Sequence, residues 1–187
     1  MRAPEAVLFL AMMVVLASCS ALPQLVRHSD PLSAEEHVKL GRSYETQGLV
    51  ADAIQQYKAA LRLQKDDVPA LVAWGNLAFA GGDWKNAETC FRRILGIDPM
   101  HAGANNNLAM VYFATGKHLD KAEQYAQIAL KQGGPLKPYV LDTLASIYIK
   151  EGRRSEAQKA LDDAVAAASP DDMALREQLA KTRERLP

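Results

Sequence analysis

A similar sequence pattern recurs about every 34 residues from Leu40 onward. This internal repeat limits the possible folds more than any other feature. Every copy has a small residue, a glycine seven residues later, and an alanine a few residues beyond the glycine. The small residues are Gly41, Gly75, Ala109 and Ala145; the glycines are Gly48, Gly82, Gly116 and Gly152; the alanines are Ala53, Ala87, Ala122 and Ala157. On both sides of the glycine, apolar or small residues recur at i, i+3 or i+4, and i+7, which is the pattern of an amphipathic helix. Each copy is therefore predicted to form two helices joined by a turn.

The turn and the helix contact in each copy have simple physical reasons. The recurrent glycine lies just past the first helix, where glycine adopts a left-handed conformation at low cost. The small residues allow the two antiparallel helices to approach closely. We expect Asp83 and Ser155 to cap second helices, and one residue inserted between Lys117 and Asp120 to change the third turn. A single unit cannot bury its apolar face alone and three or more must stack, a requirement that four copies satisfy.

These copies resemble the tetratricopeptide repeat, a helix–turn–helix unit of about 34 residues. The residues that carry the resemblance are Leu40-Gly41-x-x-Tyr44, Trp74-Gly75-x-x-Ala78, Leu108-Ala109-x-x-Tyr112 and Leu144-Ala145-x-x-Tyr148. The resemblance implies an all-α fold, an α-solenoid of about four repeats. Their expected bounds within 33–171 are 34–67, 68–101, 102–137 and 138–171, and a capping helix follows at 172–187. In that last helix Leu175, Leu179 and Leu186 are expected to face inward, and the charged residues to form a solvated face.

The first residues of the chain are typical of an export signal. Ala6–Ala17 is an apolar run of 12 residues, shorter than the roughly 20 needed to cross a bilayer but suited to a signal-peptide core. The run ends in Leu16-Ala17-Ser18-Cys19, which resembles the lipobox of bacterial lipoproteins. That resemblance implies removal of residues 1–18 and acylation of Cys19, and Ser20 points to the outer membrane, facing the periplasm. An ordinary secretory signal with an incidental cysteine, or an anchor that is never cleaved, are the alternatives.

The stretch that follows, residues 19–32, is predicted to be a lipidated tether because it holds two prolines and has no helical periodicity. The folded part is expected to start at a capping box formed by Ser33 and Glu36. The second cysteine, Cys90, lies on a helical face between Ala87 and Ile94 and is expected to be a small buried hydrophobe. An intermolecular disulfide at Cys90 is the alternative.

Composition and motifs argue against several classes of function. The 22 basic residues balance the 22 acidic ones, so there is no electrostatic reason to expect nucleic acid. The four histidines lack zinc-site spacing, and no phosphate-loop, nucleophile-elbow or zinc-protease motif occurs. The carboxylate pairs at 66–67, 162–163 and 171–172 are expected to flank helix ends. We expect no enzyme, no catalytic residue, no metal, no cofactor and no small-molecule substrate.

The resemblance to tetratricopeptide repeats places a binding surface on the concave side, built from the first helix of each repeat. The residues carried over to this partner-binding groove are Arg42, Asn76, Phe79, Asn106, Asn107, Met110, Phe113, Tyr139 and Asp142. Phe79 and Phe113 occupy the same place in successive repeats, so their rings are expected to lie side by side and to contact a partner's side chain. The asparagines offer amides to a peptide backbone. Alternatively, the two rings pad the inner wall or pack on the tether.

The function these features favour is that of a membrane-anchored adaptor in envelope complex assembly. Lipoproteins of this architecture resemble those of the tight-adherence and type IV pilus systems, which implies a protein partner such as a secretin or a pilus component. The alternatives are an exopolysaccharide-export scaffold, suggested by Tyr139–Ala145, and a regulator of peptidoglycan enzymes.

Overall fold

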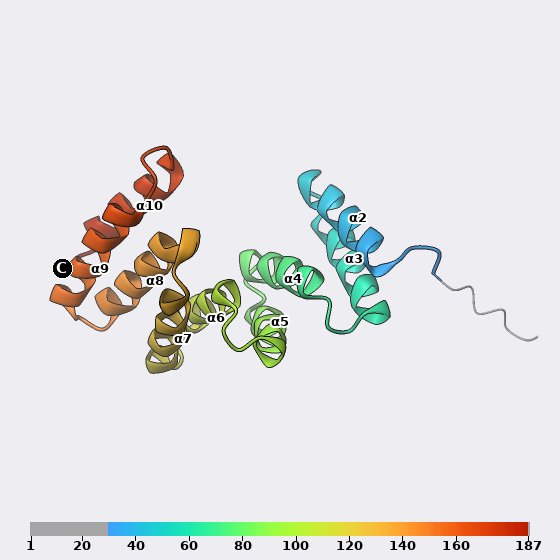
Figure 1. Ribbon diagram of the computed structural model, residues 1–187, viewed down its shortest axis with the longest axis horizontal. Helices are drawn as coiled ribbons and strands as arrows, with labels where there is room; N and C mark the ends of the chain where they lie inside the picture. Colours follow the sequence, from blue (N-terminus) through green and yellow to red (C-terminus); the bar gives the residue numbers. More distant parts are fainter. Residues whose placement is uncertain (1–29, 187) are drawn as a thin grey trace, which may run out of the picture. The chain divides into compact units, whose positions relative to one another are not determined.

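The computed structural model describes residues 30–186, and the helices of this described part lie in the second of two units, Met1–Pro31 and Leu32–Pro187 (Figure 1). The predicted signal peptide, Cys19 and nearly all of the tether lie outside the described residues. In the described part there are nine α-helices, one short 3-10 helix and no strands. They are α2 (Ala34–Thr46), α3 (Val50–Leu63), α4 (Val68–Ala80), α5 (Trp84–Ile97), α6 (Ala102–Thr115), α7 (Leu119–Gln132), η1 (Gly134–Leu136), α8 (Lys137–Lys150), α9 (Arg154–Ala167) and α10 (Met173–Glu184). The predicted all-α class is confirmed.

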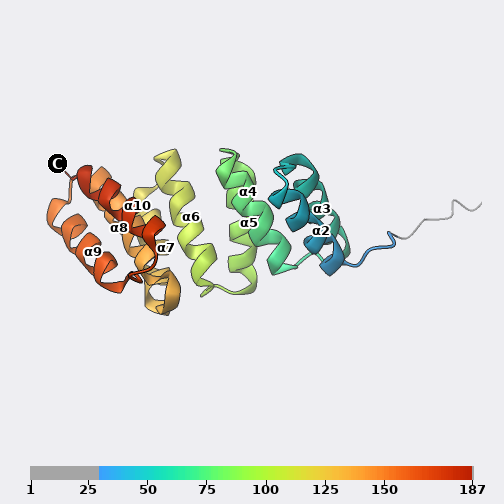
Figure 2. The same ribbon diagram turned by 90° about the horizontal axis from the view of Figure 1, so that it is seen from above.

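The helices form four pairs that follow one another along the chain. Helix α2 packs on α3, α4 on α5, α6 on α7, and α8 on α9. The first helices also contact one another in order, α2 with α4, α4 with α6, and α6 with α8, and α10 extends this row by contacting α8 and α9. Figure 2 shows the pairs stacked within this unit. The stacking lets each pair bury an apolar face that it could not bury alone, so the predicted solenoid is confirmed.

The small residues of the first helices are required by the close approach of the second helices. A Cβ atom at Gly41 would lie 2.5 Å from the ring of Tyr57, and one at Gly75 would lie 2.7 Å from the ring of Phe91. Both rings are fully buried. The recurrent glycines of the turns have positive φ angles, 75° at Gly48, 73° at Gly82, 67° at Gly116 and 73° at Gly152. Both predictions made for these positions are confirmed.

Most of the predicted helix caps are present. The amide of Ser33 donates to Glu36 Oε2 at 2.7 Å and the Glu36 amide donates to Ser33 Oγ at 3.3 Å, which completes the capping box. Asp83 accepts from the Asn86 amide at 3.2 Å and so caps α5. The cap predicted at Ser155 is wrong.

The helix that Ser155 was expected to cap starts earlier than predicted. Ser155 lies inside α9, whose N-cap residue is Arg153. The Arg153 amide donates to the Tyr148 carbonyl at 2.8 Å, which closes the turn around Gly152 and starts the helix at once. The same bond joins Asp83 to Ala78 in the second pair, at 2.8 Å. The residue after the turn glycine is therefore the N-cap in both places.

The inserted residue changes the third turn, as expected. Helix α7 begins at Leu119, one residue further past Gly116 than α5 begins past Gly82. The backbone of His118 has a φ of 57°, and it is the one positive φ outside glycine in residues 30–186. His118 makes no side-chain cap to α7. The extra residue is thus accommodated by a second left-handed residue, which is unfavourable for a side chain with a Cβ.

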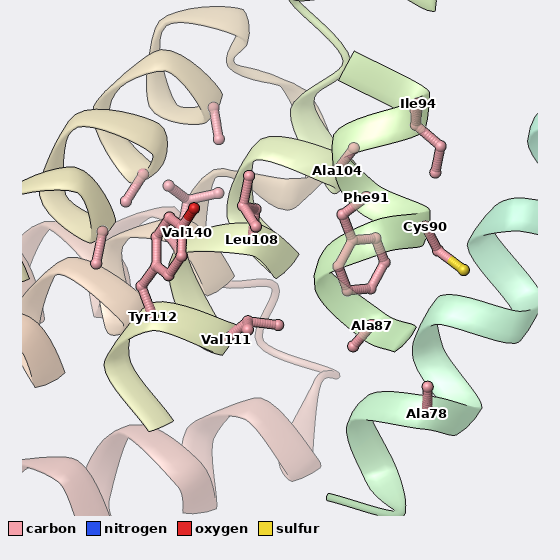
Figure 3. Close-up of a cluster of buried hydrophobic side chains, with 14 of the residues drawn as sticks. Ala78, Ala87, Cys90, Phe91, Ile94, Ala104, Leu108, Val111, Tyr112 and Val140 are labelled. Carbon is pink, nitrogen blue, oxygen red and sulfur yellow. The ribbon is translucent and has the colours of Figure 1, made fainter. Parts of the chain in front are cut away.

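The core lies between the two helices of each pair and between each second helix and the first helix of the next pair. Figure 3 shows Ala87, Cys90, Phe91 and Ile94 of α5 facing side chains of α4 and α6. Cys90 is 1% exposed, and this burial raises the pKa of its thiol to about 12. The prediction that Cys90 is a small buried hydrophobe is confirmed. A disulfide to another molecule would require this part of the core to open.

Candidate functional site

Three adjoining pockets lie along the first helices, and together we call them the groove. The N-terminal pocket, of about 640 Å³, lies between α2 and α4 and is lined by Arg42, Glu45, Thr46, Val68, Pro69, Val72, Ala73 and Asn76. The central pocket, of about 150 Å³, lies between α4 and α6 and is lined by Asn76, Phe79, Asn107 and Met110. The C-terminal pocket, of about 510 Å³, is formed by α6, η1, α8 and α10, and is lined by Asn106, Asn107, Met110, Phe113, Leu136, Tyr139, Asp142, Thr143, Ser146, Gln178, Lys181, Thr182 and Arg185.

Shared residues make the three pockets continuous. Asn76 lines both the N-terminal and the central pocket, and Asn107 and Met110 line both the central and the C-terminal pocket. The Asn107 amide donates to Asn76 Oδ1 at 2.9 Å, so these two side chains also bridge α4 and α6. All nine side chains that the sequence assigned to the groove line one of its pockets.

The two phenylalanines have different ring partners, and the side-by-side placement of their rings stays a prediction. The Phe79 ring meets the edge of Trp84 at a centroid distance of 5.3 Å and an angle of 72°. The Phe113 ring lies under Lys150 Nζ, 4.9 Å from the ring centroid, and Lys150 also donates to the Phe113 carbonyl at 2.9 Å. The partner of Phe79 lies in its own helix pair, and the partner of Phe113 lies in the next pair. Phe79 and Phe113 therefore line different pockets, both of which Met110 also lines.

The C-terminal pocket has polar groups at its base. Asp142 and Asn106 line it although they are only 4% and 8% exposed. Gln178 Nε2 donates to Asp142 Oδ2 at 2.5 Å. Asp142 Oδ1 and Asn106 Oδ1 are buried and have no hydrogen-bond partner among residues 30–186. Buried acceptors without donors are uncommon in folded proteins, so this base is chemically incomplete.

The edge of the same pocket carries an ordered tyrosine. Tyr139 is 39% exposed, and its hydroxyl donates to Asp172 Oδ2 at 2.5 Å. This hydrogen bond raises the pKa of Tyr139 and lowers the pKa of Asp172. Asp172 also accepts from the Leu175 amide at 3.0 Å and so caps α10. The tyrosine ring is thus held beside the pocket by the start of the last helix.

The N-terminal pocket is bordered by a hydrogen bond between the two helices of the first pair. Tyr57 of α3 donates from its hydroxyl to Glu45 Oε2 of α2 at 2.8 Å. Burial, and then this bond, raise the pKa of Tyr57. Arg42 and Glu45 place one charge of each sign at this end of the groove.

Sequence reasoning missed the contribution of α10. The charges of this helix were expected to form a solvated face, and yet Lys181 and Arg185 line the C-terminal pocket together with Gln178 and Thr182. Leu175 and Leu179 are buried, as expected. The order of the helices in the sequence could have indicated this. A helix that follows the last pair occupies the place of a further first helix, and so it presents side chains to the groove.

The neighbouring acidic residues cap helices or bind nearby side chains of the described part. Asp67 accepts from the Ala70 amide at 2.8 Å and caps α4, as Asp172 caps α10. The pair at 162–163 lies within α9, so its expected place at a helix end is wrong, and Asp162 accepts from Gln158 and Arg183.

Residues 30–186 contain no group of three His, Cys, Asp or Glu side chains arranged to hold a metal ion. None of the described helices has the length and the hydropathy that a membrane crossing requires.

Comparison with known proteins gives local sequence similarity to two curated proteins. The chain is 32% identical over 80 residues to the photosystem I assembly protein Ycf3 of Cyanophora paradoxa, a match that covers 41% of this chain and 46% of that protein. It is 33% identical over 88 residues to the tetratricopeptide repeat protein 14 of Mus musculus, covering 47% of this chain and 12% of that protein. The matches thus span less than half the length of either relative.

Several solved structures share the fold over most of the chain. A crystal structure of MamA aligns with a TM-score of 0.66 and 26% identity, covering 81% of this chain and 83% of that one. The tetratricopeptide-repeat protein TTC0263 of Thermus thermophilus aligns with a TM-score of 0.68 and 23% identity over 83% and 84% of the two chains. The pilF protein of Pseudomonas aeruginosa aligns with a TM-score of 0.67 and 21% identity over 83% and 71%.

Family models agree with the repeats seen in the sequence and the structure. One model described as tetratricopeptide repeat matches residues 20–68 and 72–138, and a second with the same description matches residues 139–171. The two models together cover most of the paired helices. The chain belongs to the tetratricopeptide-repeat family, whose repeats mediate interactions between proteins.

Proposed function

We propose that the chain is a lipid-anchored adaptor that holds a segment of a protein partner in the groove while an envelope complex is assembled. Pilus biogenesis or secretion is the process we favour, with a secretin or pilus component as the partner. The observation that carries the proposal is the continuity of the three pockets, since Asn76, Asn107 and Met110 each line two of them. A continuous groove suits a peptide segment better than a small molecule. We expect no catalytic activity.

The anchor part of the proposal rests on the sequence. Leu16-Ala17-Ser18-Cys19 follows an apolar run and resembles a lipobox. Two or three acyl chains hold a protein to a membrane stably, because each buried methylene contributes about 0.8 kcal/mol. An anchor on the periplasmic side of the outer membrane would confine the groove near other membrane components and raise its effective concentration there.

The assembly part draws support from two of the similar proteins. One relative is named a photosystem I assembly protein, and one solved structure is of pilF, which has the same fold. This chain shares local sequence similarity with the first and the fold with the second. The pilus or secretion context of this chain is our proposal and is tested as follows.

Capture of the partner from cells tests the groove directly. A photo-crosslinking amino acid at Met110, in place of the side chain that lines both the central and the C-terminal pocket, is expected to link the partner in living cells. The double variant Phe79→Ala/Phe113→Ala in the same background is expected to lose the crosslink while keeping the helical CD signal. Ile97→Ala, which removes a 46% exposed apolar side chain outside the groove, is the matched control and is expected to keep the crosslink.

The identity of the crosslinked protein decides the process. A secretin or a pilus protein identified by mass spectrometry supports the favoured process. A crosslink that is equally strong in the double variant would show that the groove does not hold the partner. A double variant that unfolds would assign the two rings to the core instead.

A further inference from the structure

We infer that the C-terminal pocket receives a lysine or arginine side chain of the partner segment, with its cationic group paired to Asp142. This inference rests on the proposed function, because it names the chemistry of the segment that the groove holds. Four kinds of observation carry it: the buried carboxylate, the second unmet acceptor, the apolar walls and the charges at the edge.

The first observation is the buried carboxylate of Asp142. It is 4% exposed, and its hydrogen bond within the described part of the chain comes from the neutral amide of Gln178, at 2.5 Å. Its Oδ1 has no donor, and no ion pair joins it to a cation within residues 30–186. Removing a carboxylate from water without a counter-charge is strongly unfavourable. A cation supplied by a partner would compensate that cost, by pairing with Oδ1 or by replacing Gln178 at Oδ2.

The second acceptor is Asn106 Oδ1, which is buried on the neighbouring first helix and has no donor in the described part of the chain. Asn106 is 8% exposed and lines the same pocket as Asp142. A guest that satisfies both needs more than one N–H group. An ammonium group carries three donors and a guanidinium group five, whereas a hydroxyl or an indole carries one.

The walls of the pocket suit the aliphatic part of such a side chain. Met110, Phe113, Leu136 and Tyr139 line the pocket, and the last two are 40% and 39% exposed. Lysine and arginine place their methylene groups along apolar surface while the charged end reaches a polar group. The pocket volume of about 510 Å³ leaves room for a long side chain and the backbone that carries it.

Charges at the edge decide between a basic and an acidic guest. Lys181 is paired with Glu177 at 2.6 Å, and both side chains are 69% exposed, so their field is screened by solvent. Arg185 is exposed as well. An acidic guest would gain a weak interaction with these exposed cations and would bring a second negative charge towards the buried Asp142. A basic guest gains the buried interaction, which is the stronger of the two.

Selection of peptides by the purified protein tests the inference without knowledge of the partner. The full chain, purified in detergent and immobilised, is panned against a random peptide library displayed on phage. Enriched peptides are then synthesised with a fluorescent label, and their affinities are measured by anisotropy for three proteins. These are the unchanged chain, Asp142→Asn, and Asp52→Asn, which makes the same change at an exposed carboxylate of α3 outside the groove.

The expected result has three parts. The enriched peptides share a lysine or arginine, and replacing that residue by leucine weakens binding. Asp142→Asn weakens binding by about tenfold or more, because a charge-assisted hydrogen bond is lost, while Asp52→Asn leaves it unchanged. Asp142→Asn also melts at the same or a higher temperature, because it removes a buried charge without a counter-charge, so the loss of binding is not a loss of fold.

Several results would overturn the inference. These are enriched peptides without a common basic residue, equal binding to Asp142→Asn, or no enrichment at all. The leucine-substituted peptide keeps the test decisive even if Asp142→Asn were poorly folded. Peptides that depend on Phe113 but carry acidic or apolar anchors would overturn this inference and leave the adaptor function standing. A crosslink from Met110 that is equally strong in the double variant Phe79→Ala/Phe113→Ala would instead remove the adaptor function itself.

Discussion

Arg153 joins the start of α9 to α7 through Glu123, with 2.7 Å between Arg153 Nη1 and Glu123 Oε2 although the two residues are 30 positions apart. The same guanidinium also binds Glu151 at 2.9 Å and Glu156 at 2.5 Å, and lies 4.2 Å from the ring centroid of Tyr148. One arginine thus connects the turn between α8 and α9 to the preceding helix pair. Hydrogen bonds to these carboxylates hold the pKa of Arg153 well above its usual range.

The variant Glu123→Gln is expected to lower the melting temperature at pH 7 by a few degrees. The bond from Arg153 is the main cause that lowers the pKa of Glu123 below 4.5, its ordinary value. A carboxyl group with a lower pKa in the folded state stabilises the fold above that ordinary value, and this contribution is lost as the pH falls through the folded-state pKa. The difference between the two proteins should therefore shrink as the pH is lowered below about 4.5.

Thermal melts followed by CD from pH 7 to pH 3 measure this difference. Glu35→Gln is the control, because Glu35 forms an exposed pair with Lys39 at 2.7 Å and its side chain is 78% exposed. Exposed pairs of this kind contribute little to stability, so this variant should melt like the unchanged chain. A gap between Glu123→Gln and the unchanged chain that stayed constant with pH would contradict the electrostatic explanation.

The contact of Gly75 with the Phe91 ring gives a prediction about packing. Gly75→Ala would place a Cβ atom 2.7 Å from the ring and 3.1 Å from Cys90 Cβ. Overpacking of this size destabilises a fold by about 1–3 kcal/mol. Urea denaturation should show that loss in the free energy of unfolding.

Gly96→Ala is the matched control for Gly75→Ala. Gly96 lies inside α5, and nothing lies within 4 Å of a Cβ atom added there. Alanine inside a helix is more stable than glycine by about 0.5–1 kcal/mol, so this variant should gain stability. Equal effects of the two substitutions would mean that Gly75 is not required by the close approach of α5.

The thiol of Cys90 is expected to react slowly in the folded protein. It is 1% exposed, and burial raises its pKa to about 12, so the reactive thiolate is scarce at neutral pH. In a Cys19→Ser background, Ellman's reagent should label the chain slowly in buffer and fast in concentrated urea. Fast labelling in buffer, or a disulfide-linked dimer, would favour the alternative that Cys90 pairs with another molecule.

The strained turn at His118 offers a stabilising substitution. His118 has a φ of 57°, and a non-glycine residue in the left-handed region is less stable there by about 1–2 kcal/mol. His118→Gly should therefore raise the melting temperature, even though it removes the edge contact with the Tyr112 ring at 6.1 Å. Lys117→Gly, one residue earlier, lacks that relief and should not. A lower melting temperature for His118→Gly would mean that the ring contact outweighs the strain.

The repeats could be predicted because they are encoded by local rules. The glycine at each turn, the small residues that let paired helices approach closely and the cap at Asp83 each depend on a few neighbouring residues, and they occur as expected. The start of α9 could not be read in this way. Ser155 is a good cap by residue type, and the backbone bond from Arg153 to Tyr148 overrides it, because the turn around Gly152 fixes where the helix begins.

The groove could be predicted in outline but not in depth. The nine side chains taken from the family positions all line the groove. The sequence could not show that Asp142 and Asn106 would be buried at its base, since their burial depends on how α6, α8 and α10 stack. The same stacking brings Lys181 and Arg185 to the pocket edge. The contacts of the Phe79 and Phe113 rings also follow from packing between helices, which spacing along one chain does not specify.

The anchor is tested by Cys19→Ser, which removes the thiol that the lipobox resemblance assigns to acylation. The variant is expected to leave the membrane fraction, because a chain without acyl groups retains no comparable membrane affinity, while its CD spectrum and melting temperature stay unchanged. Fractionation of cells followed by immunoblotting measures the distribution. Cys90→Ala keeps Cys19 and should stay in the membrane fraction. If Cys19→Ser remained membrane-bound, then an uncleaved anchor would account better for the apolar run at Ala6–Ala17. If it left the membrane but still crosslinked its partner from Met110 at full strength, then the anchor would serve location alone and would not raise the effective concentration of the groove.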